Sequence, residues 1–229
     1  MARELELLDV EAHRTLRVRT GGLETPHFVQ VVAGEFATTA TRCPILLTKN
    51  PETGQFYIGA MFGFKPGENL LEEASGPAPY RPLDLERQGF FISGENIAID
   101  RENPRFSDHD GQPLFEADGT PADRLRHIQK ILGQLKNGVE ETDRFIRAMI
   151  EHRLVEAIDI SLRFDDGETI TLQGLYTISL DSLGELEDGA ALALFRRGYL
   201  QLAYCMIDSL RQISALAHLR NHRLTINSY

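Results

Sequence analysis

The first hundred residues carry short apolar or alternating runs, separated by residues typical of turns. The runs cover 14–19, 28–32, 45–48 and 55–64. A period of two is the pattern of half-buried strands, and the pairs Asn50-Pro51 and Pro66-Gly67 are typical of turns. The runs at 44–49 and 55–61, joined by KNPETG, predict a hairpin, and 90–92 and 97–99 predict two further strands.

From Thr120 onward the hydrophobic spacing changes to three and four residues. The order Thr120-Pro121-Ala122-Asp123 predicts a helix cap with proline at the first helical position. An apolar stripe then continues from Leu125 to the region of 154, which predicts one long helix. At Asn137-Gly138 we expect this helix to bend or break, because glycine costs about 1 kcal/mol relative to alanine.

The last third combines a hairpin with helices. Alternating runs at 159–164 and 168–173 flank Asp165-Asp166-Gly167 and predict a β-hairpin, which 176–180 extends. A helix at 190–197 is expected, capped by Asp188 and closed by Gly198, followed by a final helix over 199–219. The sequence therefore predicts a single α+β domain over residues 1–229. Its parts are an antiparallel, strand-rich N-terminal half, a long central helix, a β-hairpin and C-terminal helices.

The charge balance excludes several functions. The chain has 24 basic and 34 acidic residues and a net charge of −10, whereas general nucleic-acid binding depends on clustered Lys and Arg. No apolar run approaches the ~18 residues of a spanning helix, so no membrane insertion is expected. The first residues, MARELELLDVEAH, lack the apolar stretch of a signal peptide. We therefore expect a cytoplasmic protein.

Few residues suggest chemistry directly. The sequence has no G-x-S-x-G elbow, Walker loop or dinucleotide glycine loop, and we predict no cofactor. Cys43 and Cys205 are interpreted as buried small hydrophobes rather than redox thiols. The acidic stretch 107–120 is interpreted as paired turns, with a calcium loop as the alternative. His218 and His222 share a helix face, but a solvated face explains them as well as metal binding, so no metal site is predicted.

One segment suggests recognition. Residues 79–91 combine prolines and aromatic residues with Arg81 and Arg87, and begin with the pair Pro79-Tyr80. Tyrosine and arginine are enriched at interface hot spots, so a partner-binding surface is one hypothesis. The alternative is a loop that its aromatic side chains pin to the core.

Taken in order, several short motifs resemble the bacterial SapC family. They are VAGEF at 32–36, CPI at 43–45, GENL at 67–70, the segment 80–91, GQPLF at 111–115, DGTP at 118–121, LQG at 172–174 and the closing pattern at 186–216. The resemblance covers nearly the whole chain. The sequence departs from the family pattern at Cys43, where an aromatic residue such as Tyr is expected.

The resemblance implies which genes lie near the gene for this protein, but it implies no reaction. The family is named after a surface-layer-associated protein, and its members generally lack an established activity. Many occur near genes for TonB-dependent receptors, halogenase-like proteins and cupin-like proteins. The leading hypothesis is an accessory protein that binds a protein or peptide partner. A second is an enzyme or enzyme subunit with a polar pocket formed by Glu35, Arg42, Asn69 and Arg81. A third is a self-assembling, surface-layer-type homo-oligomer.

Overall fold

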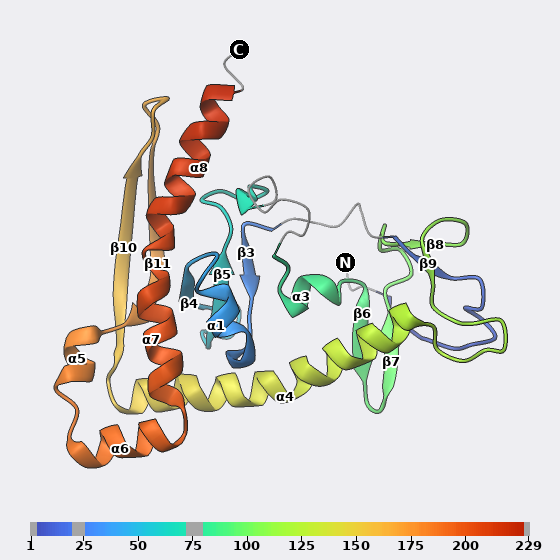
Figure 1. Ribbon diagram of the computed structural model, residues 1–229, viewed down its shortest axis with the longest axis horizontal. Helices are drawn as coiled ribbons and strands as arrows, with labels where there is room; N and C mark the ends of the chain where they lie inside the picture. Colours follow the sequence, from blue (N-terminus) through green and yellow to red (C-terminus); the bar gives the residue numbers. More distant parts are fainter. Residues whose placement is uncertain (1–3, 20–25, 72–79, 227–229) are drawn as a thin grey trace. The chain divides into compact units, whose positions relative to one another are not determined.

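The computed structural model describes residues 4–19, 26–71 and 80–226, and it shows an α+β protein (Figure 1). Its contacts divide the chain into two compact units. Unit 1 contains Met1–Glu24 and Leu83–Asn137, and unit 2 contains Thr25–Pro82 and Gly138–Tyr229. The predicted fold class is confirmed, and the single domain stays a prediction. Within the described ranges no helix is long and apolar enough to cross a membrane.

Unit 1 is built on two small antiparallel sheets. Its elements are β1 (Glu6–Leu7), β2 (Arg17–Val18), α3 (Leu83–Glu86), β6 (Phe90–Ser93), β7 (Asn96–Ile99), β8 (Phe106–Ser107), β9 (Gln112–Pro113) and the first part of α4 (Asp123–Glu151). The strand orders are β1-β7-β6 and β8-β2-β9. The strands predicted at 90–92 and 97–99 form the β6–β7 hairpin, with Phe90 opposite Ile99. Apolar side chains of both sheets and of α4 share one core.

Unit 2 is built on one five-stranded antiparallel sheet. Its strands are β3 (Phe28–Gln30), β4 (Ile45–Lys49), β5 (Phe56–Met61), β10 (Val155–Arg163) and β11 (Thr169–Ile178). The order is β10-β11-β4-β5-β3, so β3 is an end strand. The predicted hairpin at 44–49 and 55–61 is β4–β5.

Short and long helices complete unit 2. They are η1 (Ala33–Glu35), α1 (Phe36–Thr39), the second part of α4, α5 (Leu180–Gly184), α6 (Asp188–Arg196), α7 (Tyr199–Ser209) and α8 (Gln212–Ile226). The Ile45 amide donates to the Ser209 hydroxyl at 2.8 Å. This buried bond fixes the end of α7 to β4 (Figure 1).

Helix α4 begins later than the sequence predicts. The amide and the hydroxyl of Thr120 both donate to Asp118 Oδ1, at 2.9 and 2.7 Å. Pro121 pairs with Phe115 in an isolated β-bridge, and the helix starts only at Asp123. The predicted cap at Thr120 is wrong because the nearer carboxylate of Asp118 takes up both of its donors.

The helix also runs without interruption through Asn137-Gly138, so the expected break is wrong. A Cβ atom on Gly138 would lie 2.7 Å from Val32 Cγ2. One turn later, Thr142 Oγ1 accepts a hydrogen bond from the Ala33 amide at 2.8 Å. The glycine is needed because the backbone of α4 comes very close to the segment entering η1.

The β10–β11 hairpin is confirmed. Its tip is Asp165-Asp166-Gly167, with Gly167 in the left-handed region at φ 84°, and a β-bulge interrupts the register between Ile158 and Ile160. The predicted extension beyond 176 is also present, since β11 continues to Ile178.

The predicted final helix over 199–219 is two helices. The Ser209 hydroxyl donates to the Met206 carbonyl at 2.6 Å while it accepts from the Ile45 amide. Side-chain bonds of this kind compete with the helical ladder, and α7 ends at Ser209. The preceding helix ends as predicted, because Gly198 follows α6 in the left-handed conformation at φ 75°. The predicted cap at Asp188 is wrong, because Asp188 is the first helical residue and the N-cap position is Glu187, without a side-chain cap bond.

A buried arginine on α8 connects three segments of unit 2. Arg220 is 6% exposed. Its Nη2 donates to Glu168 Oε2 at 2.7 Å, and its Nη1 lies 3.3 Å from Glu68 Oε1. Its guanidinium lies 4.4 Å from the centre of the Phe164 ring. Arg220 therefore holds α8, the tip of the β10–β11 hairpin and the loop after β5 together.

We expect Gly138→Ala to lower the free energy of unfolding by about 1–3 kcal/mol, because the new methyl group overlaps Val32. The matched control is Gly133→Ala on the same helix, where a Cβ atom meets nothing within 4 Å. It should raise the free energy of unfolding by about 0.5–1 kcal/mol. Urea unfolding followed by circular dichroism measures both, and equal effects would contradict the role assigned to Gly138.

Arg220→Ala should lower the free energy of unfolding by roughly 3–5 kcal/mol, because two carboxylates lose their shared cation. Arg220→Lys should lower the free energy of unfolding by an intermediate amount, because an ammonium group keeps the charge but lacks the planar fork that reaches both carboxylates. Arg211→Ala is the control, because Arg211 is 71% exposed in its pair with Asp208, and it should change stability by about 1 kcal/mol or less. Similar losses for Arg220→Ala and Arg211→Ala in chemical unfolding would refute the role of the buried network.

Candidate functional site

Glu35, predicted to line a polar pocket, stabilises its own turn. Its Oε2 accepts a hydrogen bond from the Val32 amide at 3.1 Å, and its carbonyl accepts one from the Thr39 hydroxyl at 2.9 Å. A carboxylate that reaches back to the amide three residues earlier satisfies a donor that the helix start leaves free.

Tyr80 lies close to Glu35, and its side chain makes contacts within the protein. Its phenol hydrogen-bonds to the Thr39 hydroxyl, and its ring packs edge-on against Phe62 with 6.2 Å between centroids. Thr39 donates its own proton to the Glu35 carbonyl, so the phenol is the donor. Burial, with the negative charge of Glu35 adding to it, raises the pKa of Tyr80. These contacts favour the interpretation in which aromatic side chains pin the loop to the core.

The other predicted residues come from different segments of the chain. Arg42 is exposed just after α1, and Arg81 is half-buried before α3. Asn69 accepts from the Leu71 amide at 3.0 Å through its side chain. Arg87, in unit 1, pairs with Asp84 at 2.6 Å and lies over the Phe91 ring. Pro79, the first residue of the predicted recognition segment, lies outside the described residues.

The carboxylates of the acidic turn at 107–120 contact nearby side chains and amides of the protein. Asp108 pairs with Arg101 at 2.7 Å, and Asp110 lies 3.3 Å from Arg19. Hydrogen bonds from Thr120 lower the pKa of Asp118. Over the described part of the chain, no group of three or more His, Cys, Asp or Glu is placed to hold a metal ion.

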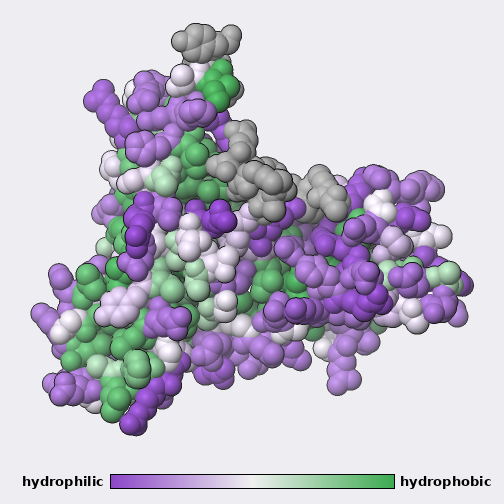
Figure 2. Space-filling view, in the orientation of Figure 1, coloured by the Kyte–Doolittle hydropathy of each residue, from purple (hydrophilic) through white to green (hydrophobic). Residues whose placement is uncertain are grey.

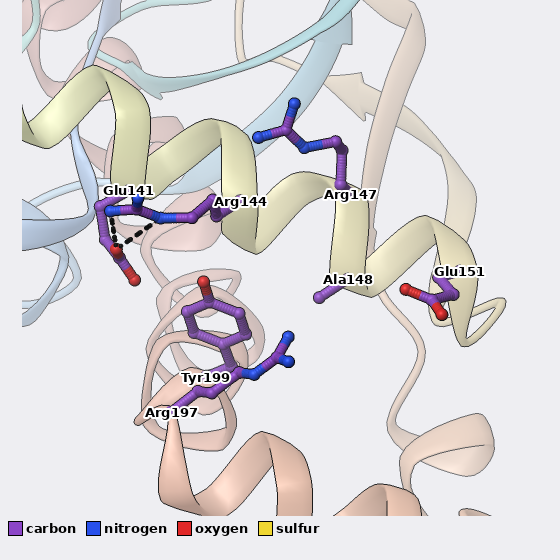
Figure 3. Close-up of a pocket in the computed structure, with 7 residues that line it drawn as sticks. All are labelled: Glu141, Arg144, Arg147, Ala148, Glu151, Arg197 and Tyr199. Atoms are coloured by element: carbon purple, nitrogen blue, oxygen red, sulfur yellow. Dashed lines mark hydrogen bonds and ion pairs between the residues drawn. The ribbon is translucent and has the colours of Figure 1, made fainter.

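A polar hollow of about 550 Å³ lies between the end of α4 and the α6–α7 junction (Figure 3). It is lined by Glu141, Arg144, Arg147, Ala148, Glu151, Arg197 and Tyr199. Arg144 donates to Glu141 Oε2 from Nε at 3.1 Å and from Nη2 at 2.7 Å. Burial and the charge of Glu141 raise the pKa of Tyr199, whose phenol points toward this pair in Figure 3. The lining has two acidic side chains, Glu141 and Glu151, and three basic ones, Arg144, Arg147 and Arg197, so its formal charge is positive by one.

A second concave site, here called the trough, crosses the five-stranded sheet. Its volume is about 420 Å³, and its lining residues are His27, Phe28, Thr48, Tyr57, Met61, Gly63, Phe64, Thr171, Leu172, Gln173 and Leu175. They come from β3, β4, β5, β11 and the segments just before β3 and after β5. Register places Tyr57 opposite Thr48, and Thr48 opposite Leu175. One cross-strand row therefore forms its floor.

Two aromatic side chains shape one end of the trough. The Phe28 ring lies over Gly59, where a Cβ atom would come within 2.2 Å of it. The same ring packs edge-on against Tyr57, with 6.1 Å between centroids. Burial raises the pKa of Tyr57, so its phenol is neutral near pH 7. The trough thus combines apolar rings with a hydroxyl that can donate or accept.

Sequence reasoning missed the trough, although it found its strands. Period-two alternation puts Tyr57 and Met61 on one face of β5, which is the only local signal. The pairing of β4 with β11 joins residues more than a hundred positions apart, and no local pattern specifies such a pairing.

The cysteines differ in exposure. Cys43 is fully buried, as predicted, and Cys205 is only half-buried. Cys43 Sγ lies 3.8 Å from the Thr39 carbonyl, and burial raises the pKa of Cys43. Burial also raises the pKa of Cys205, to which nearby Asp208 contributes. Both thiols are therefore poor nucleophiles at neutral pH.

We expect a thiol reagent such as DTNB at pH 8 to modify Cys43 only when the protein unfolds. Cys205 should react in the native state, but more slowly than a free cysteine. The variants Cys43→Ser and Cys205→Ser separate the two reactions. Rapid native labelling of the Cys205→Ser protein would show that the Cys43 thiol is accessible, contrary to this structure.

Comparison with known proteins identifies one family. The SapC family model matches residues 8–216, which includes parts of both units. Neither the curated proteins nor the solved structures include a significant match. The match agrees with the motif order from 32–36 through 186–216. The chain belongs to the SapC family.

Proposed function

We propose that this SapC-family protein is an accessory protein that binds a protein or peptide partner in the trough. The observation that carries the proposal is the composition of the lining. Charged residues are 25% of the chain, but none of the residues that line the trough is Asp, Glu, Lys or Arg. Depletion of charge together with aromatic residues and Met is the signature of the core of a protein interface.

The position of the trough suits an extended segment of a partner. Phe28 belongs to β3, the end strand of the sheet, and Thr171 and Gln173 provide a polar rim at the other side. Extended peptides commonly bind beside an end strand, where backbone bonds supply affinity and pockets select side chains. We expect apolar or aromatic side chains of the partner to pack between Phe28, Tyr57 and Leu172.

The family context supplies the first candidates for the partner. These are TonB-dependent receptors, halogenase-like proteins and cupin-like proteins encoded near SapC-family genes. We place the interaction in the cytoplasm. Support for this location comes from Cys43 and Cys205, which are both free thiols, as is usual in reducing compartments.

The test is binding of purified neighbouring gene products by isothermal calorimetry, with pull-down as a first screen. Tyr57→Ala should weaken a specific complex by about 2 kcal/mol, roughly 30-fold in Kd, if Tyr57 is a hot spot. Thr171→Arg adds a charge to the rim without removing packing and should weaken it similarly. Thr169→Arg is the matched control, because Thr169 is an exposed residue of the same strand outside the trough.

Circular dichroism confirms that each variant is folded. If no neighbouring product binds at micromolar concentration, or if Thr171→Arg and Thr169→Arg have the same effect, the proposal is wrong.

A further inference from the structure

Helix α6 carries an apolar face that points away from its own unit. Leu194 is buried, but Leu192 is 48% exposed and Phe195 is 69% exposed. Asp188, Leu192 and Phe195 follow at spacings of four and three residues, so they share one helix face. Figure 2 shows hydrophobic residues gathered over α5 and α6. A large exposed apolar patch of this kind marks an interaction surface.

The charges on α6 are divided between its ends. Glu187 and Asp188 begin the helix, and Arg196 and Arg197 end it. All four are exposed, and none forms an ion pair with another described residue. The helix dipole favours this distribution. Arg197 lines the polar hollow beside α4, whereas Asp188 and Arg196 are available to a partner.

These charges are placed symmetrically about Leu192. Asp188 and Arg196 are each four residues from it, and Glu187 and Arg197 are each five residues from it. If a second α6 lies antiparallel with Leu192 opposite Leu192, Asp188 of each copy lies at the height of Arg196 of the other. Glu187 and Arg197 lie about 140° around the helix from Leu192 and face away from the partner. The step of eight residues from Asp188 to Arg196 spans about 12 Å of helix.

We propose that α6 is a self-complementary dimerisation helix on which a second copy of this chain docks antiparallel, with the two-fold axis at Leu192. Leu192 and Phe195 supply the apolar centre, and the Asp188–Arg196 pairs flank it on both sides. Such an isologous interface closes on itself and yields a dimer rather than a lattice. The proposal does not depend on the trough, which lies on other elements.

The size of the surface predicts moderate affinity. One helix of nine residues covers less than the roughly 800 Å² per partner of a standard interface. We therefore expect a dimer that dissociates on dilution.

The test is sedimentation equilibrium of the full chain up to hundreds of micromolar, where the wild type should pass from monomer to dimer. Phe195→Glu should remain a monomer over the whole range. A monomeric wild type at the highest concentration would overturn the proposal.

A charge swap tests the pairing itself. Asp188→Arg alone and Arg196→Asp alone should each be monomeric, because like charges then face each other. A one-to-one mixture of these two variants should form a heterodimer, since both flanking pairs regain opposite charges. Glu95→Arg, which makes the same change of charge on an exposed turn of unit 1, should dimerise like the wild type. Failure of the mixture to associate, or dimers formed by either variant alone, would exclude the antiparallel pairing.

Discussion

The arrangement of unit 2 depends on one buried cation, the guanidinium of Arg220. Taking an arginine out of water is costly unless carboxylates and hydrogen bonds replace the lost hydration, and here Glu68 and Glu168 do so from two different segments. Glu68 also accepts a hydrogen bond from the Phe64 amide at 2.7 Å. Phe64, which lines the trough, packs against Phe164 with 5.5 Å between ring centroids. The wall of the proposed binding site is therefore held in place through the same ion network.

Most of the fold follows from local patterns in the sequence. Alternation located the β4–β5 and β10–β11 hairpins, and Gly198 marked the end of α6 as expected. Of three errors in the helix predictions, two depend on a contact that is distant in sequence, and the third depends on a competing hydrogen bond two residues away. Thr120 donates hydrogen bonds to Asp118, the Ser209 hydroxyl is bonded to the Ile45 amide, and Gly138 leaves room for Val32. Ile45 and Val32 are distant in sequence from Ser209 and Gly138, so helix propensity does not predict these contacts.

The functional surfaces were much less predictable than the strands. Polarity suggested Glu35 and Asn69, but both accept hydrogen bonds from nearby amides, as short polar turns often do. Tyr80 has the composition of a hot spot and the environment of a core residue. Phe195 is a large apolar residue of the kind that usually lies in a core, but its side chain is mostly exposed. Exposure and strand order decide these cases, and both are properties of the folded chain.

The division of the chain has a consequence for the order in which the protein folds during synthesis. The chain passes between the units at 24–25, 82–83 and 137–138, so each unit is made of two separate stretches. All of unit 1 has been synthesised once residue 137 is added, whereas unit 2 must wait for α8 and Arg220. Until then its first stretch, including β3, β4 and β5, lacks the strands and helices that complete its core. Long-range closure of this kind is slow, and it leaves the growing chain dependent on its last helix.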